Sequence, residues 1–351
     1  KLLYGLRQSP RLFSQLLMSK LIAFGLQRCA SDPCIFRLTS LDGKEARLVV
    51  GVYQDDLIVT GESRCCRELR AFLQQSFPTK DLGSLSYYVG CEYSRNRTAG
   101  TLRVTQTACI DRLVEKFGVT TSSPTPALTS ASLSPRKTEE PRCEKSYQEA
   151  VGGLMWIANA TRPDISNAVC EVARQAHDPS ESHWRAVLKA IEYPKGTRDK
   201  GITYKKSPSS RLTAYADSSF AENKQDRQSV SGGVVSLAGG AISWISRAQL
   251  CITLSTTESE YVALSGVVRE IVFLRGLLEF LLPGLQRGAE TVLEDNDGAV
   301  KLASNPICTN RTKNSDVGSH FVRDKVEEKT IRVVHVSSED QTADGLTKNL
   351  P

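Results

Sequence analysis

The stretch ARLVVGVYQDDLIVTGES, residues 46–63, places two adjacent carboxylates, Asp55 and Asp56, between two apolar runs. Short runs rich in β-branched residues predict buried strands, so the stretch predicts two strands that meet at the carboxylates. A hairpin turn would explain them, because Asp side chains hydrogen-bond the turn backbone. A metal site would also explain them. Adjacent carboxylates raise each other's pKa unless a cation neutralises them. Their oxygens suit Mg²⁺ or Mn²⁺, and two such ions about 4 Å apart serve phosphoryl transfer. The stretch alone leaves both explanations open.

Composition limits the classes of protein to consider. A length of 351 residues predicts two or three domains. A net charge of +6 is compatible with a nucleic-acid partner but does not require one. The ten cysteines contain no CxxC motif, only Cys65 and Cys66 are adjacent, and the chain has four histidines. This pattern disfavours a zinc site and predicts reduced thiols. No apolar run approaches ~18 residues, so we expect no membrane span.

The first part of the chain alternates helical and strand patterns. Helices are expected over 9–26, where Gly25 provides a C-terminal stop, and over 66–77. Residues 84–106 predict a hairpin. Residues 119–145 are rich in Ser, Thr and Pro and predict a linker. Residues 146–205 predict helices, one of which we expect Pro194 to end early.

From residue 210 the pattern changes. Strands are expected at 211–220 and 290–295, together with a hairpin around Gly239-Gly240 and a strand over 330–340. Helices are expected over 255–282, just after 295, over 316–328 and over 341–350. This order predicts a mixed sheet covered by helices, in an α/β or α+β domain.

Four carboxylates stand at element ends in this last region. Asp217 is expected to end the first strand, Asp295 to end the fourth, and Asp344 to begin the final helix. Carboxyl ends of strands are where open α/β sheets bind ligands. Together with a glutamate of the long helix, these residues would hold two divalent ions.

The long helix offers two glutamates for that position. Ser255 and Glu258 fit a capping box, although Thr257 and Glu260 have the same spacing. Glu260 continues the apolar stripe that predicts the sheet-facing side of the helix, and a buried carboxylate there needs compensation. We therefore expect Glu260 to be the ligand and Glu258 the cap.

Several phrases, in this order, carry a resemblance to a known family. They include KLLYGLRQSPRLF, YQDDLIVTG, KDLGSLSYYVG, ATRPDISNAV, LSTTESEYVAL, EDNDGAVKLASNP and DQTADGLTK. The chain resembles the Pol polyprotein of copia-type LTR retrotransposons, from within the reverse transcriptase to the end of the ribonuclease H. The resemblance implies a partial palm over 1–118, the linker over 119–145, a thumb or connection over 146–205 and a ribonuclease H-like domain over 206–351.

The same resemblance implies site residues and partners. Catalytic metal ligands would be Asp55 and Asp56 in the polymerase and Asp217, Glu260, Asp295 and Asp344 in the ribonuclease H. Nucleotide or template contacts would come from Tyr4, Gly5, Gln8, Ser9, Pro10 and Tyr53. Two Mg²⁺ or Mn²⁺ ions per active site, an RNA/DNA hybrid, a template–primer and a dNTP are implied, in a cytoplasmic particle or the nucleus.

The chain also departs from the pattern of the family that it resembles. The fingers and a third polymerase carboxylate would lie upstream of YGLRQSP, in a missing N-terminal Pol segment. We therefore expect ribonuclease H activity, rather than polymerase activity, from these 351 residues. Asn314 and Ser315 replace the usual residues of an RTKHI phrase. His320 is expected to be a packing or surface residue. A catalytically dead relic that only binds nucleic acid is the alternative.

Overall fold

The computed structural model describes residues 7–126, 133–207, 209–221, 227–285, 287–304 and 316–349. Its contacts group the chain into two compact units. The first comprises Lys1–Val89 with Val272–Arg287, and the second comprises Gly90–Ile271 with Gly288–Pro351. The expected replacements at Asn314 and Ser315 lie outside the described residues.

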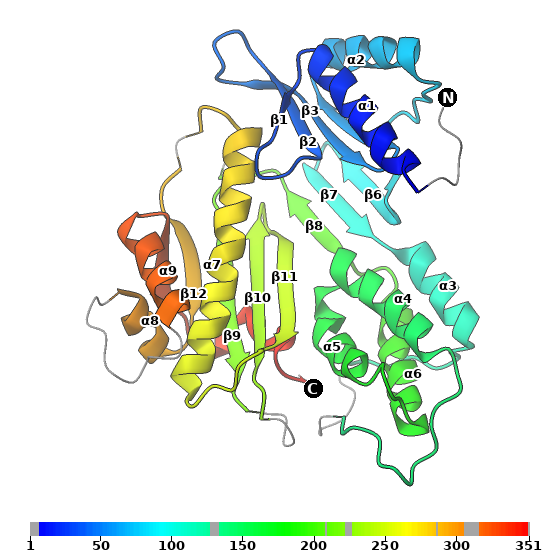
Figure 1. Ribbon diagram of the computed structural model, residues 1–351, viewed down its shortest axis with the longest axis vertical. Helices are drawn as coiled ribbons and strands as arrows, with labels where there is room; N and C mark the ends of the chain where they lie inside the picture. Colours follow the sequence, from blue (N-terminus) through cyan, green and yellow to red (C-terminus); the bar gives the residue numbers. More distant parts are fainter. Residues whose placement is uncertain are drawn as a thin grey trace. The chain divides into compact units, whose positions relative to one another are not determined.

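The first unit contains an antiparallel sheet in chain order. Its strands are β1 (Gln27–Arg28), β2 (Ile35–Thr39), β3 (Ala46–Tyr53) and β4 (Asp56–Gly61). Helices α1 (Ser9–Ala23) and α2 (Ser63–Ser76) follow the expected ranges, and β5 (Tyr87–Tyr88) comes near the end of the segment. Figure 1 shows α1 and α2 beside this sheet. The helices and the sheet form one core, to which buried residues of β3 contribute. Its fully buried side chains include Leu21, Phe36, Leu48 and Val50.

The second unit begins with a smaller sheet and a group of helices. Strands β6 (Cys91–Asn96) and β7 (Thr101–Thr105) form the expected hairpin, and β8 (Ile202–Lys205) pairs with β7. The helices are α3 (Thr107–Phe117), α4 (Tyr147–Ala160), the 3₁₀ turn η1 (Pro163–Ile165), α5 (Ser166–Arg174) and α6 (Glu181–Gly196). They bury a common apolar core. Among the described residues of 119–145 there is no helix or strand.

Pro194 does not end its helix, contrary to the expectation from sequence. It lies inside α6, which continues to Gly196. Proline removes one backbone donor, but here the loss falls in the last turn. Ile191, Tyr193 and Pro194 are all buried, so their packing offsets the missing hydrogen bond.

The larger sheet of the second unit is mixed, as the sequence predicts. Its strands are β9 (Thr213–Ser219), β10 (Val230–Leu237), β11 (Gly240–Ala248), β12 (Glu290–Glu294) and β13 (Ile331–His335). Their order is β11-β10-β9-β12-β13, with β9, β12 and β13 parallel to one another and β10 antiparallel to both neighbours. Figure 1 shows α7 (Thr256–Leu281) running along this sheet, with α8 (Asp297–Ser304) and α9 (Asp316–Glu327) beside β12. The molecule is therefore an α+β protein.

The C-terminal helix is tighter than expected. Residues Thr342–Leu346 form the 3₁₀ helix η3, which follows a shorter 3₁₀ turn, η2 (Ser338–Asp340). Asp344 is the third residue of η3 rather than its first. Every cysteine of the described residues is a free thiol. In the part of the chain that the structure describes, no helix is long and apolar enough to cross a membrane.

Candidate functional site

The adjacent carboxylates of the opening stretch lie on a strand-to-strand turn. Tyr53 and Asp56 form the last pair of the β3–β4 ladder, and Gln54 adopts a left-handed backbone conformation with φ 56°. Asp55 and Asp56 are exposed. The predicted hairpin is confirmed, and both carboxylates are accessible to a cation or a solvent shell.

Tyr88 lies close to this turn. Its pKa is raised, chiefly because the phenol is partly buried and next because of the negative charge of Asp56. The expected nucleotide-binding residues Gln8, Ser9 and Pro10 stand at the start of α1, where Gln8 and Pro10 are exposed. Tyr53 is also exposed, whereas Tyr4 and Gly5 lie outside the described residues.

In the second unit, three of the four expected carboxylates come together. Asp217, Glu260 and Asp295 each offer one oxygen, and these atoms lie within 4.8 Å of one another. Asp217 and Glu260 are 1% and 8% exposed, whereas Asp295 is half-buried. The three residues come from β9, from α7 and from the residue that follows β12.

The sheet register explains how two of these aspartates meet. Tyr215 of β9 is paired with Leu293 of the parallel strand β12. Asp217 and Asp295 each lie two residues further along, so their side chains leave the same face at the same level. Asp217 is therefore two residues inside its strand rather than at its end, a small correction to the expectation from sequence.

The apolar stripe of α7 explains the third carboxylate. Leu264, Val267 and Ile271 are fully buried, as the helical period predicts, and Glu260 continues their row. A buried hydrogen bond of 2.8 Å from Ser218 Oγ to Ser259 Oγ ties α7 to β9 beside the site. The helix start is thereby held against the strand that carries Asp217.

Glu258 has the other role expected of it. The Ser255 hydroxyl accepts from the Glu258 amide at 3.2 Å, and the Glu258 carboxylate accepts from the amide of Leu254 at 2.7 Å. This is a capping arrangement displaced by one residue from the standard box. Glu258 thus satisfies the helix start, whereas Glu260 points to the sheet.

Burial perturbs the acidity of the cluster. It raises the pKa of Glu260 to about 8, with the charges of Asp217 and Asp295 adding to the effect. It also raises the pKa of Asp217, although a hydrogen bond from Thr347 and the charge of Lys348 act in the opposite direction. Oε2 of Glu260 is buried without a hydrogen-bond partner. A carboxylate oxygen in that position requires a proton or a cation.

Asp344 does not join the group of three. Its Oδ1 lies 2.7 Å from the ammonium of Lys348, which also lies 3.8 Å from Oδ1 of Asp217. The Thr347 hydroxyl donates to Oδ2 of Asp217. Asp344 therefore acts on the cluster through its charge and through Lys348.

Glu294 is a carboxylate that sequence reasoning missed. It is fully buried and burial raises its pKa to about 10, with the charge of Glu260 as the next cause. One oxygen accepts from the amide of Asn296 at 3.1 Å, and the other has no partner. Only its place on the inward face of β12, two residues from buried Val292, could have indicated it.

The donor set fits a divalent cation. Carboxylate oxygens are the ligands of Mg²⁺ and Mn²⁺, and here three of them converge. The unpartnered oxygen of Glu260 and the raised pKa values of Glu260 and Asp217 are consistent with a site that a cation would neutralise.

Comparisons with known proteins agree with the resemblance to the Pol polyproteins of copia-type retrotransposons. Residues 1–129 match the family model described as reverse transcriptase (RNA-dependent DNA polymerase). The chain is similar over its whole length to the retrovirus-related Pol polyproteins of transposon TNT 1-94 from Nicotiana tabacum, at 33% identity, and of transposon RE1 from Arabidopsis thaliana, at 35% identity. It covers 27% and 24% of those proteins, so it spans about a quarter of the length of the curated relatives it matches.

A solved structure also matches the chain. LC11-RNase H1, isolated from compost by a metagenomic approach, has 18% identity and a TM-score of 0.31. The match covers 40% of this chain and 94% of that one.

Proposed function

We propose that the second unit carries a ribonuclease H centre that hydrolyses the RNA strand of an RNA/DNA hybrid. The observation that carries the proposal is the convergence of Asp217, Glu260 and Asp295 from three separate elements, with their oxygens within 4.8 Å. Similarity to retrotransposon Pol polyproteins supports the choice of a nucleic acid as substrate.

In this proposal Asp217, Glu260 and Asp295 hold divalent cations, and Asp344 joins them when Lys348 moves away. A bound pair of ions would supply an activated water and neutralise charge on the leaving 3′ oxygen. Because burial raises the pKa of Glu260 to about 8, its carboxyl group is largely protonated at neutral pH. Cation binding should therefore release a proton from Glu260.

We also propose that Asp55 and Asp56 belong to the polymerase centre of the intact polyprotein. The exposed turn between β3 and β4 would present both carboxylates to a metal-bound nucleotide. The nearby phenol of Tyr88 would then border the same surface.

The test is a cleavage assay with the 351-residue chain, an RNA/DNA hybrid labelled in the RNA strand, and Mg²⁺. We expect cleavage of the hybrid but not of single-stranded RNA, and no cleavage without Mg²⁺. Asp217→Asn should reduce the rate by at least about 10³-fold, the loss of roughly 4 kcal/mol of transition-state stabilisation. Asp324→Asn, an exposed carboxylate of α9, is the matched control and should leave the rate unchanged. Cleavage that survives Asp217→Asn, or no cleavage by the unmodified chain, would contradict the proposal.

A further inference from the structure

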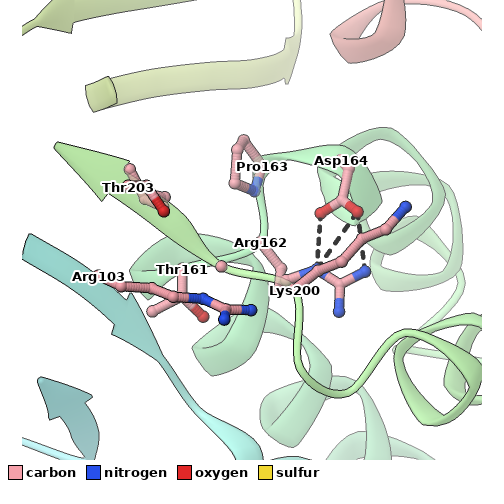
Figure 2. Close-up of a pocket in the computed structure, with 9 residues that line it drawn as sticks. Arg103, Thr161, Arg162, Pro163, Asp164, Lys200 and Thr203 are labelled. Atoms are coloured by element: carbon pink, nitrogen blue, oxygen red, sulfur yellow. Dashed lines mark hydrogen bonds and ion pairs between the residues drawn. The ribbon is translucent and has the colours of Figure 1, made fainter. Parts of the chain in front are cut away.

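A second polar site lies in the same unit, between the small sheet and the helices. It is an open pocket of about 440 Å³. Figure 2 shows side chains converging on it from β7, from the end of α4 with η1, and from the loop that leads into β8. The residues that matter here are Arg103, Thr161, Arg162, Asp164, Lys200 and Thr203.

The pocket carries an excess of positive charge. Arg162 is only 1% exposed, and its guanidinium is held by Asp164 at 2.8 Å and by the Thr197 carbonyl at 3.0 Å. That pair is internally neutral and forms part of the pocket wall. Arg103 and Lys200 are exposed, and neither forms an ion pair with any described residue. Two positive charges are thus left to face the opening.

Each of the two cations has one contact within the protein. The guanidinium of Arg103 donates to the carbonyl of Asp199. The ammonium of Lys200 lies 5.8 Å from the centre of the Tyr193 ring, which is buried beneath it. The next residue, Gly201, permits the close approach of this loop to β7, because a Cβ there would lie 2.1 Å from the Val104 carbonyl oxygen.

The strand register extends the polar surface beyond the pocket. Arg103 is paired with Ser94 on β6 and with Thr203 on β8. One step along the same face, Thr101 is paired with Asn96 and Lys205. Because cross-strand partners share a face, these two rows hold hydrogen-bond donors and two cations, and no carboxylate.

The opposite face of this sheet is used for packing. Tyr204 donates its hydroxyl to the carbonyl of Ala241 at 2.7 Å, and Ile202 is buried against Gly240. The row of donors around Arg103 is therefore the face left open.

We propose that this pocket and the two rows beside it bind the phosphates of a nucleic-acid strand. Arg and Lys side chains with Ser, Thr and Asn donors are the groups that contact phosphodiester backbones. No exposed aromatic ring lines the pocket, so the surface holds the backbone without stacking on the bases. The inference rests on the proposed function only for the identity of the polymer, the RNA/DNA hybrid.

The test is binding of a fluorescein-labelled RNA/DNA hybrid to the 351-residue chain in EDTA, measured by anisotropy from low to high salt. The variant Arg103→Ala with Lys200→Ala should weaken binding about tenfold or more at low salt. It should also reduce the magnitude of the slope of log K against log salt by about 1.8, because each of two lost phosphate contacts would release about 0.9 fewer counterions. Arg162 is left intact because its substitution would disturb the buried pair.

The matched control removes the same charges elsewhere in the unit. Lys137→Ala with Arg185→Ala changes one exposed lysine and one exposed arginine, and its salt slope should match that of the unmodified chain. Equal losses in the two double variants would overturn the proposal, as would competition by poly-glutamate as effective as by unlabelled hybrid, which would indicate an acidic protein partner. The binding assay contains EDTA, so its result does not depend on metal-dependent cleavage. Failure of the cleavage proposal therefore leaves the binding proposal testable, and the reverse also holds.

Discussion

The ammonium nitrogen of Lys348 lies 3.8 Å from Oδ1 of Asp217, a carboxylate that is 1% exposed. A side chain of the C-terminal segment thus brings a positive charge to the edge of the buried carboxylate cluster. The same ammonium is 2.7 Å from Asp344. Lys348 therefore partly compensates, in the metal-free protein, the charge that a divalent cation would neutralise.

Replacing Lys348 with methionine should strengthen cation binding. The ammonium repels an incoming Mg²⁺ ion, so its removal should tighten Mg²⁺ binding about threefold to tenfold, equivalent to roughly 0.7–1.4 kcal/mol. The melting temperature without metal should fall, because Asp217 and Asp344 lose their partner. Calorimetric titration and thermal unfolding would measure both effects.

Lys325→Met provides the comparison for that variant. Lys325 also forms a 2.7 Å ion pair, with Glu328, but on the surface of α9. Its loss should leave Mg²⁺ affinity unchanged. If Lys348→Met bound Mg²⁺ no more tightly than Lys325→Met, the electrostatic role given to Lys348 would be wrong.

Glu260 and Glu258 should respond differently to the same substitution. Glu260→Gln removes a charge from the cluster but keeps the shape, so hybrid cleavage and Mg²⁺-dependent stabilisation should both disappear while the fold persists. Glu258→Gln should retain activity, because its carboxylate accepts a bond from the amide of Leu254 and a glutamine oxygen can accept the same bond. Circular dichroism, melting temperature and cleavage rate would separate the two. The assignment fails if Glu258→Gln is the inactive variant.

The metal-free protein should lose stability as the pH rises from about 5 to 8. Burial raises the pKa of Glu260 to about 8 and that of Glu294 to about 10, both above the value in an unfolded chain. The folded form therefore binds more protons than the unfolded form in this interval. The stabilising contribution of each group is complete below the unfolded pKa. Above it, stability declines by about 1.4 kcal/mol per pH unit for each group, because the unfolded state releases its proton while the folded state keeps it, and the decline ends once the pH passes the folded pKa.

Glu294→Gln should flatten this dependence, because it removes one buried carboxyl group while keeping a similar volume. Glu339→Gln, at an exposed position, should leave the dependence unchanged. Melting temperatures in EDTA at several pH values would measure the pH dependence of stability in each variant. A Glu294→Gln profile parallel to that of the unmodified protein would show that Glu294 does not titrate in the folded state as the structure implies.

The hairpin that presents Asp55 and Asp56 should depend on Gly61. Gly61 has φ +146°, and a Cβ there would lie 2.3 Å from the carbonyl oxygen of Arg47 on the paired strand. Gly61→Ala should destabilise the first unit by about 2 kcal/mol or more, since the clash is with backbone. Gly43→Ala meets no atom within 4 Å at φ +71°, so it should cost only about 1 kcal/mol. Urea unfolding of the two variants would test this, and equal losses would show that the close strand approach is not required.

The sequence by itself determined the elements whose patterns are local. The apolar stripe of α7 identified both the buried side of the helix and Glu260 within it, and the cap residues Ser255 and Glu258 marked its start. Alternation and turn residues likewise predicted the strands that carry Asp56 and Asp217. The sequence alone also predicted the family resemblance and the mixed sheet, because both depend on motifs and on the order of elements along the chain.

The tertiary structure decided what depends on distant neighbours. No local pattern shows that Glu294 is buried near the charge of Glu260, because the two approach each other only when α7 packs on the sheet. The roles of Lys348 and Thr347 depend on a C-terminal segment that reaches β9, more than a hundred residues earlier in the chain. Pro194 stayed within its helix because tertiary burial outweighed a local rule. The polar pocket needed β7 and β8 to pair, which places Arg103 beside Lys200 although almost a hundred residues separate them. The sequence determines which side chains are present. Only packing determines the distances between their charges, and those distances set the pKa values and the contacts of the charged groups.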